Sequence, residues 1–144
     1  MDLLKIASVP ATTASPEASV FDAVSLMNEQ RVGAVAITEN DKLAGIFTER
    51  DLMIRVVLAR KDAKTTPVSD VMTPNCVSAK QDMTMGEALL VMSDLHFRHL
   101  PVVDDDNKVL GLLSIRDLLH SRVDKLSQEL ESVIAFFTAD GIGG

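Results

Sequence analysis

A hydroxyl and a carboxylate recur at the same spacing in two places along this chain. Thr48 precedes Asp51 by three residues, and Ser114 precedes Asp117 by three residues, each pair shortly after a glycine. An ionised aspartate only accepts hydrogen bonds, so its two oxygens suit a ribose diol. A hydroxyl beside the free amides of a helix N-terminus suits a phosphate. The competing interpretation is that the acids are ordinary first-turn charges and the hydroxyls are N-caps.

The two motifs belong to a repeat that covers most of the chain. Residues 45–52 match residues 111–118, and residues 22–27 match residues 87–92. The second copy is one residue longer, and the extra residue falls in a polar turn, where an insertion costs little. A repeat whose length changes only in a loop predicts two copies of one fold.

Each copy is expected to have the element order β-α-β-β-α. In the first copy, Ser19 caps an amphipathic helix over 19–30, and apolar runs at 32–37 and 43–47 form two strands. The strands are antiparallel across an Asn40–Asp41 turn, and a second helix covers 49–61. In the second copy, the corresponding ranges are a helix from Thr84 to about 95, strands at 100–103 and 109–113, and a helix over 116–123.

The expected fold class is α/β (α+β). A small mixed sheet covered by helices on one side leaves its other face bare, so the two sheets should stack in a pseudo-two-fold arrangement. The expected boundaries are 4–61 for the first copy, 62–74 for a linker, 75–123 for the second copy, and 124–144 for a C-terminal helix and frayed tail. Apolar residues follow one side of this helix over 124–137. It could contact a partner, mediate dimerisation or pack back on the repeats.

Composition narrows the class of protein further. With 14 basic and 21 acidic residues, the net charge is −7, which disfavours binding to nucleic acid. No apolar run approaches the ~18 residues that span a bilayer, and the N-terminus does not have the pattern of a signal peptide. The single Cys76 cannot form an intramolecular disulfide, which is consistent with a reducing compartment. We therefore expect a cytoplasmic protein that binds neither nucleic acid nor membrane.

Motifs of common enzymes are absent from the sequence. There is no nucleophile elbow, P-loop, His-Glu-x-x-His or Gly-x-Gly-x-x-Gly pattern. His96 and His99 have no carboxylate or thiol at metal-ligand spacing, so no metal site is expected. We expect a protein that is not an enzyme and that requires no cofactor.

The repeat resembles a tandem pair of CBS domains, also called a Bateman module. The resemblance covers about residues 4–123, and its most specific parts are Asp70-Val71-Met72-Thr73, His99-Leu100-Pro101-Val102-Val103-Asp104 and the Gly-x-x-(Thr/Ser)-x-x-Asp motif of both copies. It implies a stand-alone regulatory module, often dimeric, that binds an adenosine-containing ligand between its repeats.

The resemblance also implies two ligand clefts. Asp51 and Asp117 would hold ribose hydroxyls, with Thr48 and Ser114 near phosphate or ribose oxygens. A hydroxyl from the opposite copy would complete each cleft. One cleft would combine Thr13 with Ser114 and Asp117, and the other would combine Ser78 with Thr48 and Asp51.

Basic residues distinguish the two clefts. Arg50 and Arg116 lie inside the two motifs, whereas Arg98 and His99 precede a strand of the second copy only. The first copy has uncharged residues at the positions matching this pair. Because arginine–phosphate contacts are charge-assisted, the cleft of Asp117 is expected to bind a phosphorylated adenosine more tightly.

Two functional hypotheses follow. The first is a sensor of AMP, ADP, ATP or a related adenosyl ligand that alters an unknown partner through a population shift. The second is an interaction or dimerisation scaffold with weak or no ligand binding. A flat homodimer is expected through helix faces that include Leu52, Val56, Leu118 and Leu119.

Overall fold

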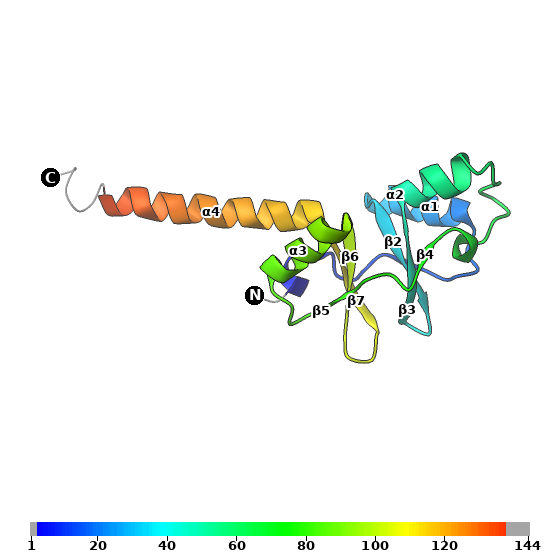
Figure 1. Ribbon diagram of the computed structural model, residues 1–144, viewed down its shortest axis with the longest axis horizontal. Helices are drawn as coiled ribbons and strands as arrows, with labels where there is room; N and C mark the ends of the chain where they lie inside the picture. Colours follow the sequence, from blue (N-terminus) through cyan, green and yellow to red (C-terminus); the bar gives the residue numbers. More distant parts are fainter. Residues whose placement is uncertain (1–2, 138–144) are drawn as a thin grey trace.

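Two small mixed sheets form the centre of the protein (Figure 1). The computed structural model describes residues 3–137, so the tail that was expected to fray lies outside the described residues. The first sheet has the order β1 (Thr13–Ala14), β2 (Ala34–Glu39), β3 (Lys42–Thr48) and β4 (Thr73–Pro74). The second has the order β5 (Ala79–Lys80), β6 (His99–Val103) and β7 (Val109–Ser114). Both sheets combine one parallel pairing with antiparallel pairing, which confirms the expected fold class.

Helices cover the outer faces of the sheets. They are η1 (Leu3–Lys5), α1 (Val20–Gln30), α2 (Glu49–Asp51), η2 (Leu52–Val57), η3 (Val68–Asp70), α3 (Met85–Leu95) and α4 (Ile115–Phe137). The predicted N-caps are confirmed, because the Ser19 hydroxyl accepts from the Asp22 amide at 3.0 Å and the Thr84 hydroxyl accepts from the Glu87 amide at 3.1 Å. Within the described residues, no helix has both the length and the apolar character needed to cross a membrane.

The hairpin of the first copy forms across the predicted turn. Asn40 and Asp41 have φ angles of 53° and 65°, a left-handed conformation that asparagine and aspartate tolerate better than most residues. Strand β2 begins at Ala34, two residues later than expected. The residue before Gly33, Val32, instead donates its amide to the Met27 carbonyl at 3.0 Å and so completes the end of α1.

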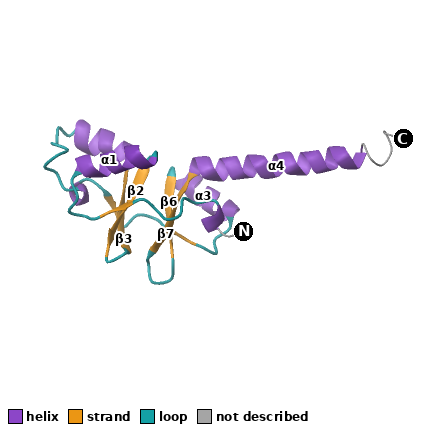
Figure 2. Ribbon diagram, turned by 180° about the vertical axis from the view of Figure 1, so that it is seen from behind, coloured by secondary structure: helices purple, strands orange, loops and turns teal. Residues whose placement is uncertain are grey.

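The two sheets stack against each other, as the bare faces required (Figure 2). Ala34, Ile46 and Leu112 form a buried cluster between them. Both hairpin tips are also linked through the backbone, since the Leu43 amide donates to the Asn107 carbonyl at 3.0 Å. The repeats therefore share an interface of apolar contacts and main-chain hydrogen bonds.

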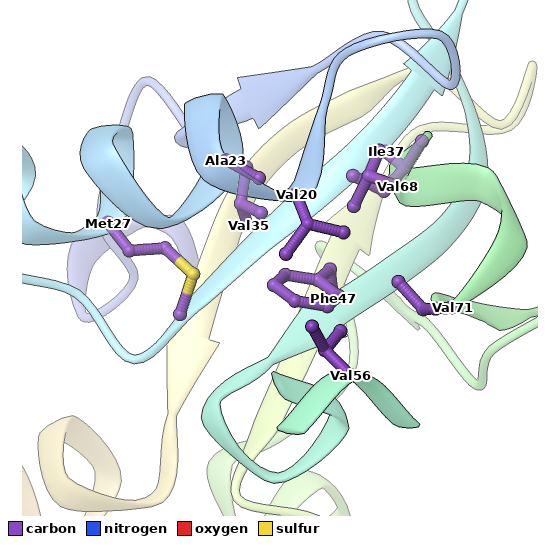
Figure 3. Packing of buried hydrophobic residues seen from close by; sticks show 9 residues of the cluster. All are labelled: Val20, Ala23, Met27, Val35, Ile37, Phe47, Val56, Val68 and Val71. Atoms are coloured by element: carbon purple, nitrogen blue, oxygen red, sulfur yellow. The ribbon is translucent and has the colours of Figure 1, made fainter. Parts of the chain in front are cut away.

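Each repeat completes its core with a segment from outside its own β-α-β-β-α unit. The first core surrounds Phe47 and includes Val68 and Val71, which lie in the range expected to be a linker (Figure 3). The second core includes Leu3, which is fully buried although it stands at the start of the first copy. The segment that precedes the second copy thus packs in the first repeat, and the N-terminal segment packs in the second repeat. This exchange of segments positions the residues described below.

Two helices differ from their predicted forms. The helix expected over 49–61 is a short α2 that continues into a π-wound η2, where the Leu58 amide donates to the Met53 carbonyl. The helices expected over 116–123 and 124–137 are one continuous α4. The predicted dimer face was wrong for Val56 and Leu118, which are 2% and 1% exposed because the protein's own cores enclose them.

Candidate functional site

The Asp51 carboxylate is bound by the chain itself. Its Oδ2 accepts from the Thr48 amide at 3.0 Å and from the Thr48 hydroxyl at 3.2 Å. Its Oδ1 accepts from the Thr73 hydroxyl at 3.2 Å and lies 3.7 Å from Nε of Arg55. Asp51 is 7% exposed. Both oxygens that could have held a ribose diol are therefore engaged by the protein.

These partners are held in place by neighbouring elements. Thr73 lies on β4, where it pairs with Ile46 of β3. Arg55 extends from η2, and its guanidinium also donates to the Met72 carbonyl at 2.7 Å. Thr48 and Asp51 form a complete capping box at the start of α2. The arrangement satisfies a buried carboxylate, which would otherwise be costly to remove from water.

Asp117 lies in the first turn of α4, the position equivalent to that of Asp51 in α2, but it has a different environment. The Ser114 hydroxyl accepts from the Asp117 amide at 3.0 Å, as Thr48 does for Asp51. The Asp117 side chain, however, lines an open hollow of about 710 Å³, which we call the Asp117 hollow. Its other lining residues are Lys5, Ile6, His120, Ser121, Asp124, Lys125 and Gln128.

Sequence differences between the copies explain why one carboxylate is enclosed and the other is not. In the alignment of the repeats, Ser121 stands at the position of Arg55, so the second copy lacks the guanidinium that binds Asp51. Lys5 stands at the position of Asp70. The Asp117 hollow thus gains a cation on a separate segment.

Arg98 and His99 lie beside the same strand–helix junction. His99 pairs with Ser114 across β6 and β7, and the Arg98 carbonyl accepts from the Ile115 amide at 2.8 Å. Burial lowers the pKa of His99, the nearby carboxylates of Glu49 and Asp117 oppose that shift, and Arg98 adds to it. The structure therefore places four of the predicted site residues, Arg98, His99, Ser114 and Asp117, around one strand–helix junction, but of these only Asp117 lines the Asp117 hollow.

Gly33 allows His99 to approach the first repeat. A Cβ at Gly33 would lie 2.5 Å from Oε1 of Glu49 and 3.2 Å from Cε1 of His99. The absence of a side chain at this position lets the imidazole of one repeat and a carboxylate of the other share the space. His99 therefore lies at the junction of the two repeats.

The remaining predicted residues are placed elsewhere. Thr13 lines a second hollow of about 250 Å³ with Thr38, Asp41, Lys108, Val109 and Leu110, and so does not line the Asp117 hollow. Ser78 is half-buried just before β5, and the hydroxyl that reaches Oδ1 of Asp51 is that of Thr73. Arg50 and Arg116 are exposed in the first turns of α2 and α4.

Sequence reasoning missed most of the lining of the Asp117 hollow. His120, Ser121 and Asp124 follow Asp117 at three, four and seven residues, so a continuous helix would have placed them on its face. No comparable signal identified Lys5, because its position depends on the exchange of the N-terminal segment into the second repeat.

Comparison with known proteins identifies the family. The CBS domain signature matches residues 4–58 and 68–124, so the chain belongs to the CBS-domain family and carries two such domains. The CBS domain-containing protein YhcV of Bacillus subtilis is 36% identical, over 81% of this chain and 80% of that protein. The CBS domain pair of protein MJ0100, solved in complex with 5′-methylthioadenosine and S-adenosyl-L-methionine, is 25% identical with a TM-score of 0.79. That match covers 87% of this chain and 98% of the other.

Several curated relatives are longer proteins. The inosine-5′-monophosphate dehydrogenase of Methanocaldococcus jannaschii is 40% identical over 76% of this chain, but the match covers 21% of the enzyme. For several relatives the chain spans 59% or less of their length. These matches establish the family and do not assign the activity of the larger proteins.

The unequal environments of the two aspartates predict unequal effects on stability. We expect Asp51→Ala to lower the free energy of unfolding by about 2 kcal/mol, because it removes a helix cap and leaves the part-buried Thr73 hydroxyl without its acceptor. Asp117→Ala should cost less than about 1 kcal/mol, the range of a first-turn charge. Urea unfolding of both variants measures the difference, and equal losses would contradict the described bonding of Asp51.

The position of His99 predicts a pH dependence. Because its pKa in the folded protein lies below the ordinary value of 6.5, the unfolded chain takes up a proton first as the pH falls. The part of the unfolding free energy that depends on neutral His99 is therefore fully present above about pH 7. It is lost as the pH falls through and below about 6.5. We expect His99→Gln to reduce the loss of unfolding free energy between pH 7.5 and pH 5.5.

A second histidine provides the control for that measurement. His96 ends α3 in a left-handed conformation with φ of 59°, which asparagine tolerates, and it is exposed. His96→Asn therefore removes an imidazole from an exposed position and is the matched control for urea unfolding at the same two pH values. If His99→Gln shows the same pH dependence as the parent protein, His99 is not the responsible group.

Proposed function

We propose that this CBS pair is a regulatory module that binds one adenosine nucleotide per chain in the Asp117 hollow. The observation that carries the proposal is the contrast between the aspartates, since Asp51 is bonded to Thr48, Thr73 and Arg55 while Asp117 lines an open hollow. The volume of about 710 Å³ lies within the range of small-molecule sites. The adenosyl ligands of the MJ0100 pair support the class of ligand.

The residues in and beside the hollow fit the parts of a nucleotide. The Asp117 carboxylate offers two acceptors to the hydroxyls of a ribose. Lys5 and Lys125 contribute ammonium groups from two different segments, and each can form a charge-assisted hydrogen bond to a phosphate. Ile6 gives the lining an apolar side chain. The carboxylates of Asp117 and Asp124 balance these two charges, so the proposed preference for a phosphorylated ligand depends on direct contacts of the two ammonium groups with the phosphate.

The same observations argue against two equal sites. A ribose at Asp51 would have to displace the Thr73 hydroxyl and the Arg55 guanidinium from a nearly buried carboxylate. The hydrogen bonds lost would offset those gained with the ligand. We therefore propose that the first copy is structural at this position and that the second copy binds the ligand.

The hollow connects segments that a ligand could hold together. Lys5 and Ile6 come from the N-terminal segment, and the remaining lining residues come from α4. A nucleotide bound between them would favour the arrangement in which these segments lie close together. A partner that distinguishes this arrangement from others would receive the signal, which is a population shift.

The alternative function is a scaffold that keeps the CBS fold without binding a nucleotide. The observation that favours it is the apolar surface of α4, where Val123, Leu130 and Phe136 are each at least 60% exposed. Such a surface indicates an interaction with another helix or protein whether or not a ligand is bound.

Calorimetric titration separates the two functions. We expect AMP to bind with a stoichiometry of one per chain and more tightly than adenosine, and Asp117→Asn to weaken AMP at least 10-fold, about 1.4 kcal/mol. Asp94→Asn removes the same charge from an exposed position on α3 and should leave the affinity unchanged. If AMP and ATP at millimolar concentration give no heat and no rise in melting temperature, the scaffold function is supported instead.

A further inference from the structure

Helix α4 extends away from the rest of the protein (Figure 1). It contains 23 residues, of which only Leu118 is buried. Every residue from Arg122 to Phe137 is exposed, so the helix does not pack back on the repeats over this length. Most of the stability of helices in proteins comes from the packing of an apolar face, and the described residues provide no such packing for this part of α4.

The exposed apolar residues of α4 follow a heptad repeat. Leu119, Val123, Leu126, Leu130, Val133 and Phe137 are separated alternately by four and three residues, and each is between 47% and 60% exposed. This is the spacing of the a and d positions of a coiled coil, with Val123, Leu130 and Phe137 at a. A period of 3.5 residues keeps such a row facing a partner helix that has the same period.

We propose that α4 pairs with α4 of a second copy of this chain in a parallel two-stranded coiled coil. The partner must present a long helix with the same heptad spacing, and α4 itself meets that requirement. Among the described helices, α1 and α3 contain 11 residues each and are too short to cover the row. A second copy is therefore the occupant that the chain can supply.

The flanking residues favour the parallel orientation. In an antiparallel pair with full overlap, Glu129 would face Glu129 of the second copy, and Phe136 would lie beside Arg122. If the antiparallel pair slid by one heptad, Arg122 of one helix would face Glu129 of the second copy. The apolar residues from Val133 to the end of the helix would then have no partner helix beside them. In the parallel pair Arg122 lies beside Ser127, and the apolar residues of the last turns meet each other.

The coiled coil is compatible with the Asp117 hollow. Five of the six α4 residues that line the hollow occupy heptad positions b, c or f, namely Asp117, Ser121, Asp124, Lys125 and Gln128. Those positions lie on the side of the helix away from a and d, while His120 occupies the flanking position e. The proposed pairing thus leaves the hollow open and does not depend on nucleotide binding.

The association state of the whole chain tests the pairing. By sedimentation at about 10 μM and above, we expect the chain to sediment as a dimer or as a multiple of a dimer. The double variant Leu126→Asp/Leu130→Asp should weaken the association at least 10-fold. Ala135→Asp introduces the same charge at an exposed f position of α4 and should leave the association unchanged.

Each outcome of this measurement decides the proposal. A monomeric parent chain at these concentrations overturns it, and so does a double variant that associates as strongly as the parent. Circular dichroism and urea unfolding show whether the double variant keeps folded repeats, which is expected because Leu126 and Leu130 lie outside both cores.

A cysteine cross-link tests the orientation. In a Cys76→Ser background, Val133→Cys places a thiol at a d position, where two thiols of a parallel pair face each other. Oxidation should then give a disulfide-linked dimer on a non-reducing gel, whereas Ala135→Cys at position f should not. A dimer in solution that fails to cross-link through position 133 would overturn the parallel coiled coil.

Discussion

A carboxylate that is removed from water must receive hydrogen bonds from the protein, and this requirement distinguishes the two halves of the molecule. Asp51 obtains its donors from Thr48, Thr73 and Arg55, and it is nearly buried. Asp117 stands at the same strand–helix junction, but the residue that matches Arg55 is Ser121. Its carboxylate therefore remains beside an open hollow. One duplicated motif thus serves as a structural cap in one copy and as a candidate ligand site in the other.

The exchange of chain segments between the repeats makes this difference possible. Residues 68–74 join the first repeat, where they supply Val68 and Val71 to the core and the Thr73 hydroxyl to Asp51. The N-terminal segment joins the second repeat, where Leu3 fills the core and Lys5 lines the Asp117 hollow. Each site is therefore completed by a segment that precedes the strands of the other copy. A change in either segment would alter a site in a repeat that is distant along the chain.

The sequence predicted the architecture because its signals are local or periodic. The duplication, the caps at Ser19 and Thr84 and the turn at Asn40–Asp41 each depend on residues close together in the chain. The burial of Val56 and Leu118 was predicted wrongly, because helical periodicity does not show which side of a helix faces its own core. Lys5 was missed because its neighbourhood depends on a long-range exchange. The contrast between the aspartates follows from Arg55 and Ser121, which become significant only once their positions in space are known.

The most direct test of the unequal-site account is a crystal structure of the chain grown with AMP. The account predicts ribose hydroxyls within hydrogen-bond distance, about 3 Å, of the Asp117 carboxylate, while Asp51 keeps its bonds to Thr48 and Thr73. A nucleotide whose ribose is held by Asp51, with Arg55 and Thr73 displaced, would contradict it.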